Sequence, residues 1–131
     1  MLKHLISVLA FVVVTFGVQG LSHFAINKAH YGKIIFMRAD HILPLGTSAM
    51  VVQGVIMSLA LSLYSAHPSL LDGLLVSLTF GAFLGLYIAL VEPSKYAVPS
   101  VTSWTWVEAS ASLVQFSLYG LILGLVHQSL S

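Results

Sequence analysis

The stretch GLLVSLTFGAFLGLYIALV, residues 73–91, decides the fold of this chain, because it runs between Asp72 and Glu92 without a charged residue. Its length matches the roughly 20 apolar residues that a helix needs to cross a ~30 Å hydrocarbon core. Three further uncharged runs are at least as long, at residues 4–27, 41–71 and 109–131. The sequence therefore predicts four membrane-spanning helices.

The composition of the whole chain favours the same class. Of its 131 residues, 58% are hydrophobic and 7% are charged, whereas a soluble domain is about 45–50% apolar and about 25% charged. This balance excludes an ordinary soluble domain and a disordered chain. The net charge of +1 excludes a nucleic-acid binder, which needs a basic face. The absence of cysteine excludes a disulfide framework, a thiolate metal site and a catalytic thiol.

The apolar runs predict helices and not barrel strands, because LAFVVV at 9–14 and LILGLV at 121–126 do not alternate polar with apolar residues. We expect one all-α transmembrane domain over residues 1–131. It is an integral membrane four-helix bundle with helices at about 4–27, 46–65, 69–91 and 102–127. Ser69 and Asp72 resemble a capping box at the start of the third helix. An even number of spans places both termini on the same side.

The positive charges predict an orientation. Loops 28–45 and 92–101 together hold Lys28, Lys33, Arg38 and Lys95, whereas the opposite side holds only Lys3. Lysine and arginine are enriched in cytoplasmic loops. We therefore expect a multi-pass protein of the cell membrane with both of these loops in the cytoplasm.

Two pairs of glycines predict close helix packing. Gly81 and Gly85 are four residues apart in the third helix, as are Gly120 and Gly124 in the fourth. Small residues at this spacing let helix backbones approach closely within a bilayer. The glycines can pack the helices of one bundle, or one pair can mediate self-association.

Five polar residues fall inside predicted spans and are candidates for an intramembrane or transport site. An ionisable group within a membrane, such as Glu108, is a functional candidate because its charged form is costly there. Alternatively, Thr105 and Glu108 form a capping box and the carboxylate marks the helix start. The glutamines can also serve only to pin one helix to another. The set is Glu108, Gln115, Gln53, Gln19 and Tyr119.

The first loop contains the densest cluster of polar residues. Lys33 and Arg38, with Asp40 and His41, could bind a lipid headgroup or another phosphate, or could form a salt-bridged loop. No H-E-x-x-H motif, nucleophile elbow or glycine-rich phosphate loop is present in the sequence. We therefore expect no catalytic residues, no metal and no cofactor.

Three short motifs carry a family resemblance: Tyr31-Gly32 after the first helix, residues 80–87 (FGAFLGLY) in the third, and residues 104–108 (WTWVE) opening the fourth. In layout the chain resembles small bacterial four-helix membrane proteins that are grouped as domains of unknown function. The resemblance implies a four-helix bundle in a bacterial inner membrane, and it implies no activity, cofactor or catalytic residue.

The leading functional expectation is a non-enzymatic membrane protein that acts through helix packing. Its partners would be the lipid bilayer and either further copies of itself or other membrane subunits. One alternative is a small oligomeric channel or transporter with a pathway along Glu108, Gln115 and Gln53. The other is a membrane enzyme that handles a lipid or a quinone and uses the first loop.

Overall fold

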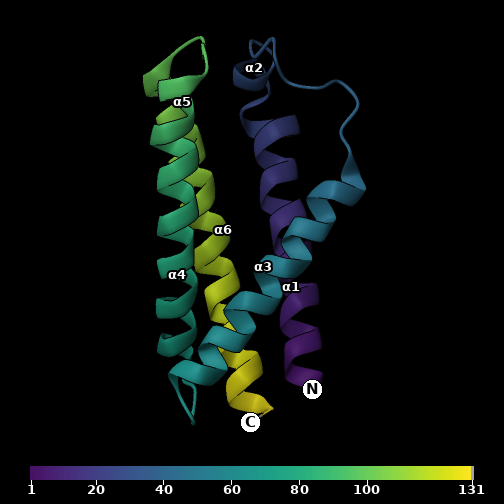
Figure 1. Ribbon diagram of the computed structural model, residues 1–131, viewed down its shortest axis with the longest axis vertical. Helices are drawn as coiled ribbons and strands as arrows, with labels where there is room; N and C mark the ends of the chain where they lie inside the picture. Colours follow the sequence, from purple (N-terminus) through teal and green to yellow (C-terminus); the bar gives the residue numbers. More distant parts are fainter. Residues whose placement is uncertain (131) are drawn as a thin grey trace.

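The computed structural model describes residues 1–130, and within that range the chain is helical and contains no strand. Four long helical rods dominate the molecule (Figure 1). The elements in chain order are α1 (Leu2–Leu21), the π-helix η1 (Ser22–Ile26), α2 (Lys28–Tyr31), α3 (Leu43–Tyr64), α4 (Leu70–Leu86), the π-helix η2 (Tyr87–Val91), α5 (Glu92–Lys95) and α6 (Val101–Ser129).

The prediction of an all-helical chain with four helices long and apolar enough to span a membrane is confirmed within residues 1–130. The rods cover residues 2–26, 43–64, 70–95 and 101–129, against the expected 4–27, 46–65, 69–91 and 102–127. The second rod begins earlier and the third ends later than expected. Pro44 occupies the first turn of α3, where a missing N–H breaks no hydrogen bond. The third rod continues through the π-helix η2 into α5, which contains Pro93.

The expected capping box at the start of α4 is also confirmed. The Asp72 backbone N–H donates to Ser69 Oγ at 3.2 Å, and the Ser69 backbone N–H donates to Asp72 Oδ2 at 2.8 Å. The two reciprocal bonds satisfy N–H groups that have no partner within the helix. They fix the sharp turn between α3 and α4.

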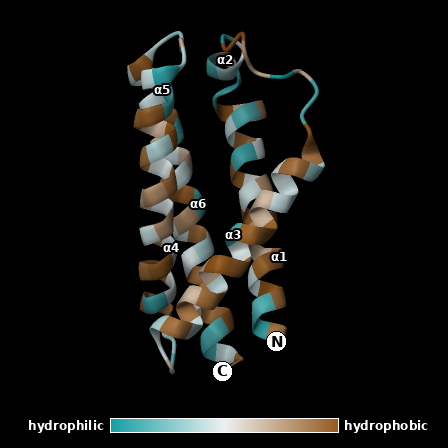
Figure 2. Ribbon diagram, viewed as in Figure 1, coloured by the Kyte–Doolittle hydropathy of each residue, from teal (hydrophilic) through white to brown (hydrophobic). Residues whose placement is uncertain are grey.

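The two ends of the molecule differ in character. Both termini and the turn between α3 and α4 lie at one end, which we call the terminal end (Figure 1). The short helices α2 and α5 lie at the other, the loop end, with the long connection from α2 to α3 (Figure 1). Hydrophobic residues occur along the whole length of the rods, and the most hydrophilic stretches lie toward the two ends (Figure 2).

Glycines bring α4 and α6 into close contact along one face of each helix. A Cβ atom added to Gly73 would collide with the backbone of Gly124, and one added to Gly81 would lie 2.5 Å from the Phe116 ring. A Cβ at Gly85 would lie 3.0 Å from Ser112. A side chain at these positions would push the helices apart, so the small residues set their separation.

The same contact accounts for both predicted glycine pairs. On α6, a Cβ at Gly120 would lie 2.9 Å from Leu74 Cα, and a Cβ at Gly124 would lie 2.7 Å from Leu70 Cα. Gly81 and Gly85 face α6 from the other side. Of the two alternatives for the glycine pairs, the structure therefore places all four residues in packing within one chain.

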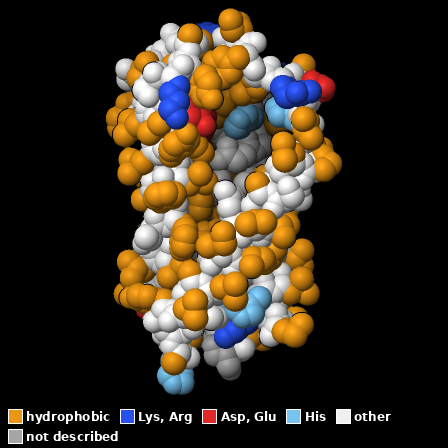
Figure 3. Space-filling model, in the orientation of Figure 1, with side chains coloured by type: hydrophobic (Ala, Val, Ile, Leu, Met, Phe, Trp, Pro, Cys, Tyr) orange, Lys and Arg blue, Asp and Glu red, His pale blue; other side chains and the backbone are white. Residues whose placement is uncertain are grey.

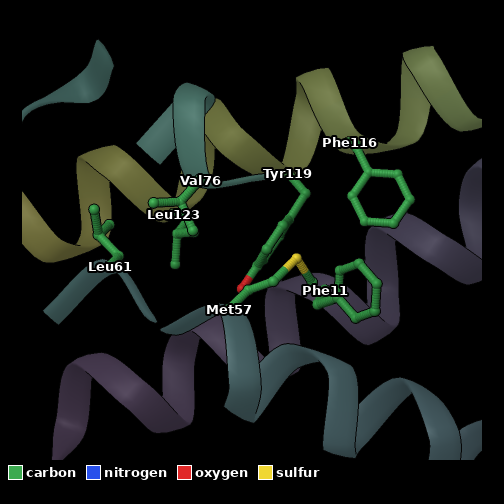
Figure 4. Packing of buried hydrophobic residues seen from close by; sticks show 7 residues of the cluster. All are labelled: Phe11, Met57, Leu61, Val76, Phe116, Tyr119 and Leu123. Atoms are coloured by element: carbon green, nitrogen blue, oxygen red, sulfur yellow. The ribbon is translucent and has the colours of Figure 1, made fainter. Parts of the chain in front are cut away.

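A hydrophobic cluster in the terminal half holds all four rods together. Aromatic rings of α1 and α6 meet there: the ring centroids of Phe11 and Tyr119 lie 4.8 Å apart, nearly edge to face. Met57 and Leu61 of α3 and Val76 of α4 close the cluster (Figure 4). A smaller cluster at the loop end consists of Tyr31, Ile34 and Trp104.

We expect Gly73→Ala to lower the thermal unfolding midpoint of the detergent-solubilised protein, because the added methyl group collides with the α6 backbone. Overpacking of this kind costs about 1–3 kcal/mol. Gly20→Ala is the matched control, since a Cβ at Gly20 meets nothing within 4 Å. Equal midpoints for the two variants would show that the glycine contact does not set the packing of α4 on α6.

Candidate functional site

Glu108 projects from α6 into the bundle and is only 8% exposed. The Tyr31 hydroxyl donates a hydrogen bond of 2.6 Å to Glu108 Oε1. This length lies in the range of O–H···O hydrogen bonds in proteins. The bond joins α2 to α6 across 77 residues of sequence. Together with the 3.0 Å contact between His30 Nδ1 and Ser103 Oγ, it holds the first loop onto the last helix.

The interpretation of Glu108 as a helix cap is wrong. The helix begins at Val101, where Ser100 Oγ accepts from the Ser103 backbone N–H at 3.2 Å. The Thr105 hydroxyl, which the cap required, instead donates to the Ala89 backbone oxygen at 3.0 Å. The carboxyl group is therefore a buried interior residue of α6.

The π-helix η2 supplies the acceptors that hold this part of α6. A π-helical turn changes the backbone hydrogen-bonding pattern and often marks a functional site. The Trp104 indole N–H donates to the Ile88 backbone oxygen at 2.9 Å, one residue before the oxygen that Thr105 uses. These two bonds fix the rotation of α6 and thereby direct Glu108 toward α1 and α2.

His23 connects the carboxyl site to the surface. Its ring stacks on Tyr31 with a centroid distance of 3.6 Å and an interplanar angle of 14°. His23 Nδ1 lies 2.9 Å from the Gln19 backbone oxygen, and because a carbonyl can only accept, Nδ1 carries a proton. In the neutral ring Nε2 is then the basic nitrogen. Burial, followed by the hydrogen bond to Glu108, raises the pKa of Tyr31 well above its usual value.

An open cavity of about 300 Å³ lies between α1 and α3. Gln19, His23 and His41 supply its polar wall, and the remaining lining is largely apolar. The space-filling view shows a hollow near the loop end of this face, with a histidine inside it and charges of both signs on its rim (Figure 3). His23 and Tyr31 connect the cavity to Glu108, because His23 lines the cavity and stacks on Tyr31, which is bonded to Glu108.

Two of the predicted glutamines extend the site toward the middle of the bundle. Gln19 Nε2 donates to Gln115 Oε1 at 2.8 Å, and Gln115 Nε2 donates to Thr15 Oγ1 at 3.0 Å. Gln19 and Gln115 therefore meet where α1 packs on α6, about two helical turns along α6 from Glu108. Tyr31 and His23 belong to the same site although they were not among the predicted site residues, because their positions depend on how the first loop folds back.

The other two predicted polar residues lie apart from this site. Gln53 lines a separate groove of about 250 Å³ between α3 and α4, and it makes none of the hydrogen bonds formed within residues 1–130. Tyr119 is fully buried in the hydrophobic cluster, and its hydroxyl has no hydrogen-bond partner in the described part of the chain. That hydroxyl points toward α3 beside Met57 (Figure 4).

The four residues predicted to meet a lipid headgroup are all exposed in the connection between α2 and α3. Arg38 and Asp40 form an ion pair of 3.4 Å with side chains 62% and 87% exposed, and such a surface pair adds little stability. His41 lines the cavity between α1 and α3. Residues 1–130 contain no cluster of three or more His, Cys, Asp or Glu side chains that could hold a metal.

A second polar cluster at the terminal end was not predicted. His4 Nδ1 lies 2.9 Å from Ser58 Oγ, which in turn lies 2.9 Å from His127 Nε2. The three residues come from α1, α3 and α6. The sequence signal for this cluster is the presence of His4 and His127 near opposite ends of the chain, because an even number of spans places both ends on the same side.

Comparisons with models of known protein families, with curated proteins and with solved structures found no match for this chain.

We expect Tyr31→Phe to lower the free energy of unfolding in detergent by about 1–3 kcal/mol, because it removes the only hydroxyl that donates to Glu108 Oε1 in the described structure. Tyr96→Phe is the control, since Tyr96 lies at the same end with 54% of its surface exposed. Its effect should stay within about 0.5 kcal/mol. Indistinguishable unfolding curves for the two variants would contradict the Tyr31–Glu108 bond.

Proposed function

We propose that the four rods cross a bacterial inner membrane, with the loop end in the cytoplasm and both termini on the opposite side. Four apolar helices of sufficient length support a multi-pass protein. Lys28, Lys33, Arg38 and Lys95 gather at the loop end, as the distribution of positive charge in membrane proteins favours. The exposed Trp106 near the start of α6 suits the headgroup region.

The chain has no cysteine, so single cysteines can test this orientation. We expect a membrane-impermeant maleimide, applied to spheroplasts so that the outer membrane presents no barrier, to label His67→Cys in the turn between α3 and α4. Lys33→Cys should react only after lysis. The opposite labelling pattern would reverse the proposed orientation, and labelling of both sites before lysis would contradict the four spans.

We infer that the protein is a small transport protein in which Glu108 binds and releases a proton. The single observation that carries this inference is the buried carboxyl group, bonded to Tyr31 and connected through the His23 ring to an open cavity. Ionisable groups inside membrane spans are costly and mark proton or solute pathways. Helix pinning alone would be served by the amides of Gln19 and Gln115, whereas a carboxyl group adds an exchangeable proton.

Polar side chains continue from Glu108 along the contact of α1 with α6. The α1 side of this contact presents a polar residue at nearly every turn, with Phe11 as the apolar exception. Antiparallel to it, α6 presents polar residues over a similar length. We call this set the polar seam: His4, Ser7, Thr15 and Gln19 on α1, His23 on η1, and Glu108, Gln115, Tyr119 and His127 on α6.

Assembly with other membrane subunits, or with further copies of the chain, is the second candidate function. The four glycines proposed for that role already pack α4 against α6. Gln53 favours assembly through a different surface, because its amide lies in the groove between α3 and α4 without a hydrogen bond from residues 1–130. A polar group from a neighbouring helix would satisfy it.

We expect purified protein in liposomes to carry protons inward under a potassium diffusion potential, reported by an internal pH-sensitive dye. Glu108→Gln should reduce this flux at least about tenfold, because the amide keeps the hydrogen-bonding shape but cannot release a proton. Asp40→Asn is the control, since it removes an exposed carboxylate from the same end.

Three results would count against the proposal. Wild-type flux no greater than that of empty liposomes would overturn the transport function. Equal flux through the wild type and Glu108→Gln would show that protons move without this carboxyl group. A fall in flux with Asp40→Asn as large as that with Glu108→Gln would indicate a surface-charge effect.

A further inference from the structure

The cluster of His4, Ser58 and His127 lies at the far end of the polar seam from Glu108. Ser58 and His127 are fully buried, whereas His4 is partly exposed near the start of α1. Both histidine nitrogens lie 2.9 Å from the same serine oxygen. The cluster therefore joins a residue at the surface to one in the interior through a single hydroxyl group.

The chemistry of serine constrains how these three groups share protons. A hydroxyl group has one hydrogen to donate and can accept further bonds. When one imidazole nitrogen donates to Ser58 Oγ, the serine hydrogen is free to be donated to the other imidazole nitrogen. If the bonds reverse, a proton passes from one histidine to the other without any movement of the helices.

The side chains between this cluster and Thr15 leave two hydroxyl groups without a partner. Ser7 and Tyr119 are both fully buried, and neither hydroxyl makes a hydrogen bond within residues 1–130. The Tyr119 hydroxyl points toward α3 beside Met57, the residue before Ser58 (Figure 4). Buried hydroxyl groups that lack a protein partner commonly bond to internal water. The Ser7 and Tyr119 hydroxyl groups thus supply polar atoms in the part of the seam where Phe11 is the apolar residue of α1.

We propose that His4, Ser58 and His127 form a proton relay at the terminal end of the seam. A proton on His4 Nδ1 passes to Ser58 Oγ while the Ser58 proton passes to His127 Nε2, so that the charge moves from the surface residue to the buried one. The reverse shift returns a proton to the surface. This inference rests on the proposed transport function, to which it adds the second point of entry and exit.

Two positive charges lie near the cluster at the start of α1. Lys3 acts on both histidines, and the amino terminus acts on His4. A purely structural link between α3 and α6 would need only Ser58 and His127. The third member, His4, gives the pair a connection to solvent.

The test compares Ser58→Ala, which removes the relay oxygen, with Ser58→Thr, which keeps a hydroxyl group. Ser62→Ala is the matched control, because Ser62 is one turn further along α3 and its hydroxyl has no partner within residues 1–130. We expect Ser58→Ala to reduce liposome proton flux at least about tenfold, with Ser58→Thr and Ser62→Ala close to the wild type. If Ser58→Ala does not fold, His4→Gln tests the same step at a partly exposed position.

A second readout separates the relay from the transport function. In ¹⁵N-histidine NMR of the protein in detergent, we expect protonation of His4 to shift the ring signals of His127, and Ser58→Ala to abolish that coupling. Unchanged flux through Ser58→Ala and His4→Gln, alongside lost flux through Glu108→Gln, would overturn the relay and leave the transport function standing. If the wild type carries no flux, coupled histidine signals that depend on Ser58 still support proton sharing, and uncoupled signals overturn it.

Discussion

The close contact of α4 with α6 at Gly73 and Gly124 is the constraint on which the rest of the structure depends. Because no side chain separates the two backbones there, α4 covers one whole face of α6. The opposite face of α6, which carries Glu108, Gln115 and Tyr119, is then left to meet α1. Helix α6 therefore lies at the centre of the bundle, between a contact made of glycine and one made of polar groups.

The contact of α6 with α4 and the contact of α6 with α1 are made by different kinds of residue. Apolar helices gain little from one another in a lipid environment, so small residues and polar bonds decide which faces meet. The glycine contact brings the backbones of α4 and α6 close together, whereas the α1 contact is made through hydrogen-bonded polar side chains. Helix α3 crosses in front of α1 and reaches α4 only near the terminal end, which leaves a groove open on that face (Figure 1).

The sequence could predict the helices, but only part of the site. The spacing of charged residues was sufficient to predict the four rods, because a membrane span requires a long uncharged run. The pattern of Thr105 and Glu108 fits both a cap and an interior position, and Ser100 settles it by capping the helix five residues earlier. The bond from Tyr31 depends on how the first loop folds back, and the position of Ser58 depends on the tilt of α3. Neither the loop conformation nor the helix tilt produces a periodic pattern in the sequence.

The π-helix η1 makes the position of Tyr31 sensitive to the number of residues between α1 and α2. A π-helical turn holds one residue more than the corresponding α-helical path, and each residue rotates a helix by about 100°. The loss of one residue from Ser22–Ile26 would turn Tyr31 away from Glu108 but would leave Thr15 and Gln19 opposite Gln115. The alignment of Tyr31 with Glu108 is thus set separately from the alignment of Gln19 with Gln115. A related chain could gain or lose the Tyr31–Glu108 bond while keeping the same bundle.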